Sequence, residues 1–482
     1  MQPGQTLDVL IVGAGISGIS AAGHLKRLCP TQRFAIAEAR DELGGTWSLF
    51  RYPGIRCDSD MYTLGFGFRP WTDHKSIAEA PTILRYLHDT VRDEGLEGLI
   101  HYGHRMQRAA WSGDTQRWTV TFERPDGTRL DVHCRFLFAC CGYYRYDRGY
   151  QPDFPGLADF RGTLVHPQHW PEGLELEDRR VVVIGSGATA VTLVPALADR
   201  GARVTMLQRS PTWMIRLPSQ DPLARLLRGW MPQRWAHALT RWKNVLGALF
   251  LFHQARGHPE RMGRFLLRQV QRVLPAGFDV ERHFKPRYGP WEQRLCVVPD
   301  DDFFKALSDG RATIVTDHVE RFVADGIVLK SGGTLPADIV VSATGLELQM
   351  LGGAELVVDG RTVQSQNLVN YKGVMYCGVP NFAATFGYTN QSWTLKADLA
   401  SRYVCRVLAH MQRSGARVCT PQAAPGLALA PWVDFSSGYF QRAAHLLPQQ
   451  ATADPWKLHQ NYLHDLRVLR WARVDDGVLR FA

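Results

Sequence analysis

A short apolar strand, a glycine-rich turn and a helix follow one another at two places in this chain, and this repeated pattern constrains the fold more than any other feature. The first copy occupies residues 8–28 and the second residues 180–198. A strand that leads through glycines into a helix begins a βαβ unit, and such units form parallel sheets covered by helices. The sequence therefore predicts an α/β fold with two Rossmann-like dinucleotide-binding domains.

In the first copy, three glycines have separate roles. Gly13 permits a tight turn, Gly15 lets the backbone approach a pyrophosphate, and Gly18 lets the helix pack closely on the strand. The next predicted strand ends at Glu38, which is placed to accept hydrogen bonds from ribose hydroxyls. A glycine-rich turn without a ligand is the alternative. The ordered succession of strand, glycines, helix, strand and acid favours a dinucleotide site.

The second copy repeats the pattern with alanine at the third small position. Its turn contains Gly185, Gly187, Thr189 and Ala190. The strand that follows, residues 203–208, ends in Arg209 and Ser210 rather than in an acid. A cation and a hydroxyl suit the 2′-phosphate of NADPH, whereas NAD favours a carboxylate at this place. Arg209 as an ordinary surface arginine is the alternative, but the preceding turn favours the NADPH interpretation.

Two dinucleotide sites in one chain predict that a nicotinamide reduces a bound flavin, so we expect FAD and NADPH as cofactors. The reduced flavin then needs an electron acceptor. The nine cysteines are scattered, with no C-x-x-C pair and no zinc-ligand spacing. This pattern favours dioxygen over a disulfide substrate, and it predicts no metal site.

The chain has 482 residues, which is too long for one ordinary domain, and its content of 45% hydrophobic and 21% charged residues is typical of a globular protein. We expect a discontinuous FAD-binding domain formed by residues 1–146 and 358–482. An NADPH-binding domain, residues 147–357, is expected between these two parts. Helical periodicity at about residues 218–290 predicts a helical insertion within the NADPH-binding domain.

A spaced pattern of aromatic, glycine, histidine and Trp-Pro residues precedes the second dinucleotide unit. It matches F-x-G-x-x-x-H-x-x-x-W-P at Phe160, Gly162, His166, Trp170 and Pro171. In this pattern the chain resembles the Baeyer–Villiger monooxygenases, the ketone-oxygenating branch of the flavin-dependent monooxygenases. His166 lies in a loop bounded by glycine and proline, so we interpret it as a hinge residue rather than as a general base.

A second pattern of the same family runs from Gly44–Trp47 through Tyr52–Gly54 to Asp58, and the resemblance spans nearly the whole chain. Residues 291–296 and 387–393 are most similar to the subgroup that includes the mycobacterial ethionamide-activating monooxygenase. That subgroup oxygenates ketones and also the sulfur of thioamides.

Two positions depart from the family pattern. Residues 139–142 read Ala-Cys-Cys-Gly where the family usually has Ala-x-Thr-Gly. Gln293 stands where many relatives have a lysine that contacts NADPH. The second departure bears on the affinity for the nicotinamide.

The resemblance assigns the catalytic roles to Arg294 and Asp58. It implies that Arg294 stabilises the anion of a C4a-peroxyflavin and then the oxyanion formed on a ketone, while Asp58 holds the arginine in place. Sequence spacing does not show that the two residues meet, and ordinary surface charges are the alternative. The resemblance assigns further cofactor contacts to Gly45, Thr46, Trp47, Asp58, Tyr62, Ala343, Thr344, Gly345 and Trp393.

The aromatic residues Trp47 and Trp393 have two interpretations. They line the flavin pocket, or they are ordinary core aromatics. Ser392 is expected to cap the helix that begins near Trp393, so that the positive end of this helix points at the flavin.

The predicted reaction inserts one oxygen atom from O2 next to a ketone carbonyl and yields an ester or lactone, with sulfoxidation as a side activity. Its substrates are a small-molecule ketone or thioether and O2. One alternative is an ordinary flavin-containing monooxygenase that acts on nitrogen or sulfur through C4a-hydroperoxyflavin. A non-catalytic flavin redox sensor belongs to a different class.

The net charge of +10 is concentrated in one segment, because residues 221–287 contain thirteen Lys and Arg against four acidic residues. A positive charge confined to one segment does not indicate nucleic-acid binding. A solvated basic face is its commonest use, and contact with an anionic membrane surface is the alternative. No secretory segment opens the chain, and no apolar run approaches the roughly 20 residues of a membrane span. We expect a cytoplasmic protein, or one peripheral to the inner face of the membrane.

Overall fold

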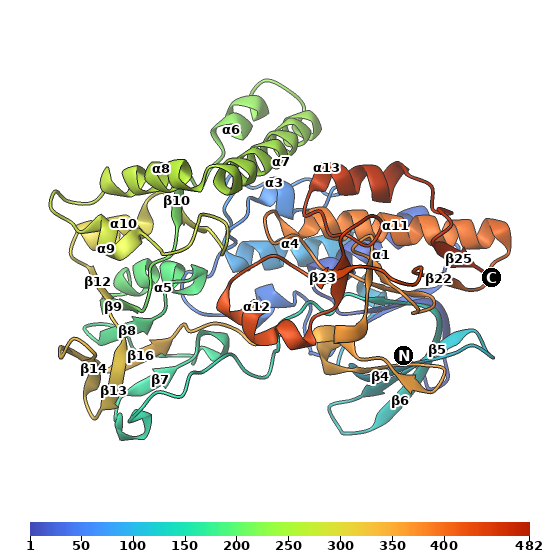
Figure 1. Ribbon diagram of the computed structural model, residues 1–482, viewed down its shortest axis with the longest axis horizontal. Helices are drawn as coiled ribbons and strands as arrows, with labels where there is room; N and C mark the ends of the chain where they lie inside the picture. The colour runs from blue at the N-terminus through green and yellow to red at the C-terminus, as the bar shows by residue number, and fades with distance from the viewer.

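The computed structural model describes residues 1–482 and has two lobes, each built on its own sheet (Figure 1). The first sheet contains β1 (Thr6–Val12), β2 (Phe34–Ala37), β3 (Ile100–His101), β4 (Arg105–Ser112), β5 (Arg117–Glu123), β6 (Arg129–Ala139), β17 (Glu355–Val358), β18 (Arg361–Thr362) and β21 (Phe382–Ala384). The strands run in the order β18-β17-β4-β5-β6-β1-β2-β3, and β21 also pairs with β6. β1 pairs in parallel with β2 and β6, and each of its faces packs into a hydrophobic core, with Val9 and Ile11 in one and Leu10 and Val12 in the other, which explains its continuous apolar run.

Helices from both ends of the chain cover the first sheet. They are α1 (Ile16–Leu28), α4 (Ala80–Asp93) and α11 (Trp393–Ser414). Their buried residues share one hydrophobic core with β1 and β6. The N-terminal and C-terminal portions of the sequence therefore form one lobe.

The second sheet is fully parallel and has five strands. They are β7 (Thr163–Val165), β8 (Arg180–Ile184), β9 (Arg203–Gln208), β12 (Ala312–Thr316) and β16 (Ile339–Ser342), in the order β12-β9-β8-β16-β7. Helices α5 (Ala188–Ala198) and α10 (Asp302–Ser308) contribute to its core. A three-stranded meander, β13 (Val319–Val323), β14 (Gly326–Leu329) and β15 (Thr334–Pro336), packs beside it.

The chain crosses between the two sheets twice. It leaves the first sheet after Ala139 and returns at Glu355, where β17 begins to pair with β4. The boundary expected between residues 357 and 358 falls inside this strand. The two crossings are hydrogen-bonded to each other: Arg145 N donates to Glu347 O at 2.9 Å, and Gln349 N donates to Tyr143 O at 2.9 Å.

A helical insertion projects from the second lobe. It consists of α6 (Pro222–Arg228), α7 (Gln233–Gly257), α8 (Pro259–Gln271) and α9 (Val280–Phe284). The chain enters it from β10 (Met214–Leu217) and leaves it into β11 (Cys296–Pro299), and these two strands pair in parallel at its base. The insertion reaches over the junction of the two lobes, at the top of Figure 1. None of the helices is both long and apolar enough to cross a membrane.

Short elements complete the fold. The short helices are α2 (Thr46–Leu49), α3 (Met61–Leu64), α12 (Gly438–Ala443) and α13 (Tyr462–Asp465). Three two-stranded pairs are β19 (Asn370–Tyr371) with β20 (Met375–Tyr376), β22 (Cys419–Pro421) with β25 (Leu479–Phe481), and β23 (Leu429–Pro431) with β24 (Gln449–Ala451).

Candidate active site at the junction of the two lobes

One large cavity, of about 1210 Å³, lies where both glycine turns meet the two chain crossings. Most of the residues predicted from the sequence line it. They are Gly13, Gly15, Glu38, Gly45, Thr46, Trp47, Asp58, Gly185, Gly187, Thr189, Arg209, Ser210, Arg294, Ala343, Thr344, Gly345 and Trp393. A single cavity thus receives both predicted dinucleotide sites and the predicted catalytic pair. Gln293 also lines it.

The first glycine turn leaves no room for side chains. Gly13 has φ +104°, and a Cβ there would lie 2.6 Å from Cys140 O. A Cβ on Gly18 would lie 1.8 Å from Gly13 O, so Gly18 serves the close packing of α1 on the turn and does not line the cavity. Gly45 faces Gly15 from the opposite side, where its Cβ would lie 3.1 Å from Gly15 Cα. This narrow backbone cradle fits a pyrophosphate.

Glu38 directly follows β2 and lies beside this cradle. Its carboxylate accepts hydrogen bonds from Ala14 N at 2.7 Å and Arg40 N at 3.0 Å. The side chain is buried, and burial raises the pKa of Glu38. The two backbone donors hold the carboxylate at the cavity wall, where an anionic acceptor suits ribose hydroxyls.

The second glycine turn has the same construction. Gly185 has φ +140°, and a Cβ there would lie 2.3 Å from Ala343 O. Ala190 is fully buried in α5 and packs that helix against the sheet, so it supports the turn without lining the cavity. Arg209 and Ser210 follow β9 and are exposed at the cavity wall. A cation and a hydroxyl at this place fit a phosphate on the ribose.

Tyr62 lies outside the cavity. It is buried in α3, and its hydroxyl accepts a hydrogen bond from Arg228 Nη2 of the insertion at 3.0 Å. This position favours a structural role in the contact between α3 and α6 of the insertion over the predicted cofactor contact. Tyr62 matched the family pattern only in sequence, and the pattern did not indicate which way its side chain points.

Arg294 and Asp58 form a bidentate ion pair in the cavity wall. Arg294 Nε donates to Asp58 Oδ2 at 2.7 Å, and Nη2 donates to Oδ1 at 2.6 Å. The Asp58 carboxylate raises the pKa of Arg294, so the guanidinium stays charged. The side chains keep 39% and 26% of their surface exposed, so the cation is fixed by its partner and still open to a ligand.

Three tyrosines that the sequence analysis did not single out lie close to this pair. Tyr143, Tyr144 and Tyr439 line the cavity, and the hydroxyls of Tyr143 and Tyr144 are 3.1 Å apart. Burial raises the pKa of all three, which keeps the hydroxyls protonated. Tyr143 and Tyr144 directly follow Gly142 in the first crossing, and this position next to a family motif is a signal that could have identified them. Nothing in the sequence indicated Tyr439.

Trp393 connects several walls of the cavity. Its indole stacks on Tyr143 with the ring centroids 5.2 Å apart, and its Nε1 donates to Ser17 Oγ at 2.7 Å. Trp47, in α2, lines the cavity close to the first glycine turn, because α2 begins directly after Gly45. Ser392 has the backbone conformation of a helix N-cap, but its hydroxyl pairs with Thr63 Oγ1 at 2.6 Å and makes no capping bond. The predicted side-chain cap is therefore wrong, because α3 supplies a competing hydroxyl.

The fingerprint Phe160–Pro171 lies beside the crossings and not in the cavity. Gln168 Nε2 donates to the carbonyls of Arg145 and Tyr146 at 2.8 and 2.9 Å. His166 packs on Gly149, where a Cβ would lie 1.9 Å from the imidazole ring. Burial lowers the pKa of His166.

The remaining fingerprint residues are spread over the second lobe. Phe160 packs edge-on against Phe322, Gly162 approaches Asp338 O, Trp170 is half-buried against the second core, and Pro171 is exposed. The pattern thus joins the first crossing to the second sheet, and this position supports a hinge role for His166.

All nine cysteines are free thiols. Cys140 and Cys141 directly follow β6 and line the cavity, and burial raises the pKa of Cys141 to about 12. A protonated thiol is a poor nucleophile. This agrees with the interpretation that the cavity does not serve a disulfide substrate.

The fold and the cavity together define the class, a protein with two dinucleotide-binding units that open into one site. Residues 11–79 match the family described as NAD(P)-binding Rossmann-like domain, and residues 79–224 match the flavin-binding monooxygenase-like family. The chain is similar in fold to a solved structure of steroid monooxygenase bound to NADP, with a TM-score of 0.73, 24% identity, and coverage of 87% of this chain and 88% of that one. It is also similar to a structure of OTEMO in complex with FAD and NADP, with a TM-score of 0.71, 20% identity, and coverage of 88% and 87%.

Closer relatives give the family. The FAD-containing monooxygenase EthA of Mycobacterium tuberculosis is 51% identical over 478 residues, which are 99% of this chain and 98% of EthA. The probable FAD-binding monooxygenase AlmA of an Acinetobacter species is 46% identical over 98% of this chain and 96% of its own length. This chain therefore belongs to the family of FAD-containing monooxygenases. The matches confirm the predicted two-domain dinucleotide-binding fold and the predicted family.

Proposed function

We propose that this enzyme is an FAD- and NADPH-dependent Baeyer–Villiger monooxygenase. A ketone, O2, NADPH and a proton give an ester or lactone, water and NADP⁺, with one oxygen atom of O2 inserted between the carbonyl carbon and its neighbour. The bidentate Arg294–Asp58 pair carries this proposal, because it places a permanent, oriented cation in the cavity that both glycine turns share. Oxygen insertion beside a carbonyl needs such a cation for the developing oxyanion.

The two glycine turns open into the same cavity, and each would hold and orient one cofactor there. Gly13, Gly15 and Glu38 would hold FAD, and Gly185 and Arg209 would hold NADPH. Bound FAD, reduced by NADPH, supplies the activation of dioxygen. Arg294 then holds the substrate oxygen by its guanidinium, and Asp58 prevents the guanidinium from turning away.

The walls beside Arg294 support an apolar substrate. Phe386, Phe435, Tyr439 and Phe440 line the cavity, and all four contribute to one small hydrophobic core with Trp432. Such walls bind hydrocarbon and exclude water, which strengthens the interaction between the guanidinium and an oxyanion. They also accept thioethers, so sulfoxidation is the proposed side activity.

The test is turnover of purified enzyme with FAD, NADPH and labelled dioxygen. We expect phenylacetone, a long-chain 2-alkanone, or both to yield an ester that carries one labelled oxygen atom, detected by mass spectrometry. The Arg294→Gln variant should form no ester from a ketone, but it should still oxidise a thioether. Sulfoxide formation without ester from any ketone would instead support an ordinary flavin-containing monooxygenase. A redox sensor would show no steady NADPH consumption.

We further propose a peripheral contact between the insertion and an anionic membrane surface. One face of α7 exposes Trp235, Leu239, Trp242, Leu246 and Phe250, spaced three or four residues apart. An apolar helical face of this width normally packs against protein or enters a lipid interface.

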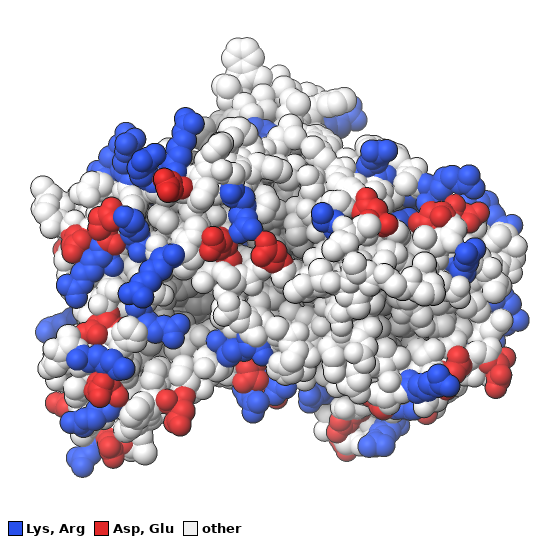
Figure 2. Space-filling view, in the orientation of Figure 1, with Lys and Arg blue, Asp and Glu red and all other residues white.

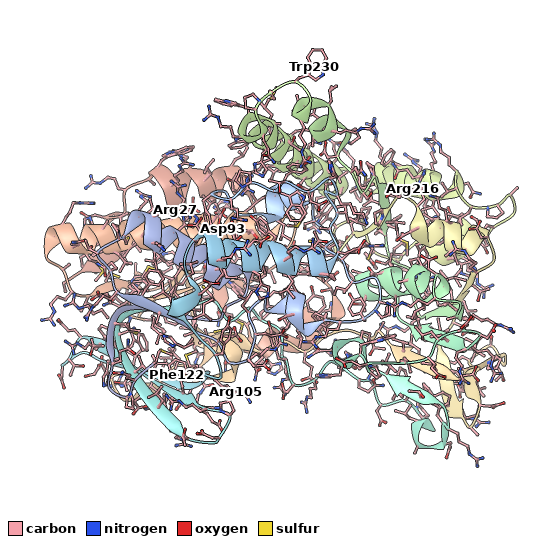
Figure 3. All side chains as sticks on the ribbon, turned by 180° about the vertical axis from the view of Figure 1, so that it is seen from behind. Arg27, Asp93, Arg105, Phe122, Arg216 and Trp230 are labelled. Carbon is pink, nitrogen blue, oxygen red and sulfur yellow. The ribbon has the colours of Figure 1, made fainter.

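The residues around this face of α7 favour contact with a lipid interface over packing against another protein. Trp230, at the tip of the insertion, is 84% exposed and points away from the molecule (Figure 3). Beside it, Lys and Arg side chains gather over α8 (Figure 2), where Arg261, Arg264 and Arg268 are exposed. An apolar face next to a basic one is complementary to a bilayer with anionic headgroups.

Flotation with vesicles tests the contact. The protein should float with vesicles containing phosphatidylglycerol, float less with purely zwitterionic vesicles, and be released by salt. Replacement of Trp230 and Trp235 by Ser should abolish flotation, whereas replacement of Trp471, an exposed tryptophan outside the insertion, should not. Equal flotation of both variants, or none for the unmodified protein, would contradict the proposal.

A further inference from the structure

A cluster of metal-ligating side chains lies on the first lobe, outside the cavity. It consists of Asp454, His459 and His464, whose nearest ligand atoms all lie within 4.8 Å of one another. His459 Nε2 is 2.5 Å from Asp454 Oδ1, and His464 Nε2 is 3.7 Å from Asp454 Oδ2. The two imidazoles are thus directed at one carboxylate, with ring centroids 3.7 Å apart.

The backbone around the cluster is held rigidly. Asn461 caps α13 through hydrogen bonds to the N–H groups of Leu463 and His464, at 2.9 and 3.2 Å. Gln450 Oε1 accepts from Leu458 N at 2.7 Å, next to His459. The two histidines therefore project from a capped helix and from a tied loop, and only their side chains need to adjust.

We infer that Asp454, His459 and His464 form a binding site for a divalent transition metal, with Zn²⁺ as the best fit. Two imidazoles and one carboxylate are ligands that Zn²⁺ accepts, with bond lengths of about 2.0–2.2 Å. The three ligand atoms lie within 4.8 Å of one another, so binding would require their side chains to rotate into the spacing that these bond lengths set. The cluster lines an open pocket of about 790 Å³, so water can complete the coordination.

The cluster is accessible from solvent. Asp454 and His459 are exposed and His464 is half-buried, so an ion can reach all three side chains. Asp475 and Asp476 line the same pocket together with Lys372, Lys457 and Arg473, and Asp476 is paired with Lys372 at 2.7 Å. A hydrogen-bonded histidine–carboxylate cluster without any ion is the alternative.

The cluster is connected to the wall of the large cavity. Asp465, directly after His464, accepts from Tyr388 Oη at 2.6 Å and from Lys396 Nζ at 2.9 Å. Gln460, directly after His459, accepts from Thr389 N at 3.0 Å. Tyr388 and Thr389 both line the large cavity. A metal at the cluster would therefore fasten the segment that braces this wall, acting as a clip and taking no part in the reaction.

The test uses tag-free enzyme with FAD bound, stripped with EDTA and then titrated with ZnSO4 by calorimetry. We expect one Zn²⁺ per chain with micromolar or tighter affinity, and visible absorption bands of low-coordinate Co²⁺ when CoCl2 is the probe. His459→Ala and His464→Ala should weaken binding by more than the roughly 10- to 100-fold that loss of an outer hydrogen-bond partner costs.

His74→Ala is the matched control, because His74 is exposed and lies outside the cluster. It should leave the stoichiometry and the affinity unchanged. Zn²⁺ should raise the melting temperature of the unmodified enzyme and of His74→Ala but not that of His459→Ala. FAD absorbance and circular dichroism verify that each variant folds, and His459→Gln replaces any that does not. Sub-stoichiometric binding, or equal binding by His459→Ala, would overturn the inference.

Discussion

The ion pair between Asp58 and Arg294 makes a quantitative prediction for a double-mutant cycle on ketone oxidation. Each of its two hydrogen bonds, at 2.7 and 2.6 Å, joins charged partners, and such bonds contribute about 1.5–3 kcal/mol each in a buried setting. Both side chains keep part of their surface in water, 39% for the arginine and 26% for the aspartate, so screening reduces the total. We therefore take roughly 2–3 kcal/mol as the energy that couples the two residues.

The two single variants should fail to different degrees. Arg294→Ala removes the cation itself, and loss of such an oxyanion-stabilising group lowers kcat by about 10²–10³-fold. Asp58→Ala leaves the cation in the cavity but free to rotate. A loss of roughly 2 kcal/mol predicts a decrease in kcat of about 30-fold.

The double variant decides whether the pair acts as a unit. Without Arg294, Asp58 has no guanidinium to orient, so the double variant should be no slower than Arg294→Ala. The assay is kcat for ester formation from one ketone, with FAD content and NADPH oxidation measured in parallel to verify cofactor binding. Losses that multiply, so that the double variant is a further 30-fold slower, would show that Asp58 acts on the reaction independently and would refute the positioning role.

Three more predictions concern other residues. Arg209→Glu should raise the KM for NADPH at least about tenfold and leave the KM for NADH nearly unchanged, because only NADPH carries the ribose phosphate. Equal increases in the two KM values would contradict the assigned site. Gly18→Val should yield protein without FAD absorbance, because a Cβ there would lie 1.8 Å from Gly13 O. His237 has a pKa lowered to about 4 by burial, below its usual value of about 6.5. The unfolded state therefore binds a proton at this histidine before the folded state does, so the free energy of unfolding that depends on neutral His237 is complete above pH 6.5 and lost as the pH falls toward 4. His237→Gln should flatten the decrease in melting temperature between pH 7 and pH 5. An unchanged slope would contradict this.

Local pattern predicted the dinucleotide units well. The first expected strand and helix are β1 and α1, and the strand expected to end at Glu38 is β2, which ends one residue earlier. These elements are determined by neighbours in sequence: an apolar strand buried on both faces, and glycines whose Cβ would clash with backbone atoms. Helical periodicity is also a property of neighbouring residues in the sequence, so the helical insertion could be predicted from it.

Long-range contacts limited the prediction of the site. Tyr62 and Ser392 occupy the expected places in sequence, yet the first pairs with Arg228 of the insertion and the second with Thr63 of α3. Tyr439 reaches the cavity from α12, far along the chain from every motif. Partners of this kind depend on how separate segments pack, and no local pattern records that.

The proposed catalytic pair depends on the docking of the two lobes. Just before Asp58, Phe50 and Tyr52 of the first lobe's motif are buried in the hydrophobic core of the second lobe. Gly54, with φ +74°, approaches α5 so closely that a Cβ there would lie 2.6 Å from Ala196 Cβ. The loop that carries Asp58 is thus anchored in the opposite lobe, next to the base of the insertion from which Arg294 projects. A motif read as a cofactor pattern therefore has a second structural role, because it places the carboxylate where the arginine needs it.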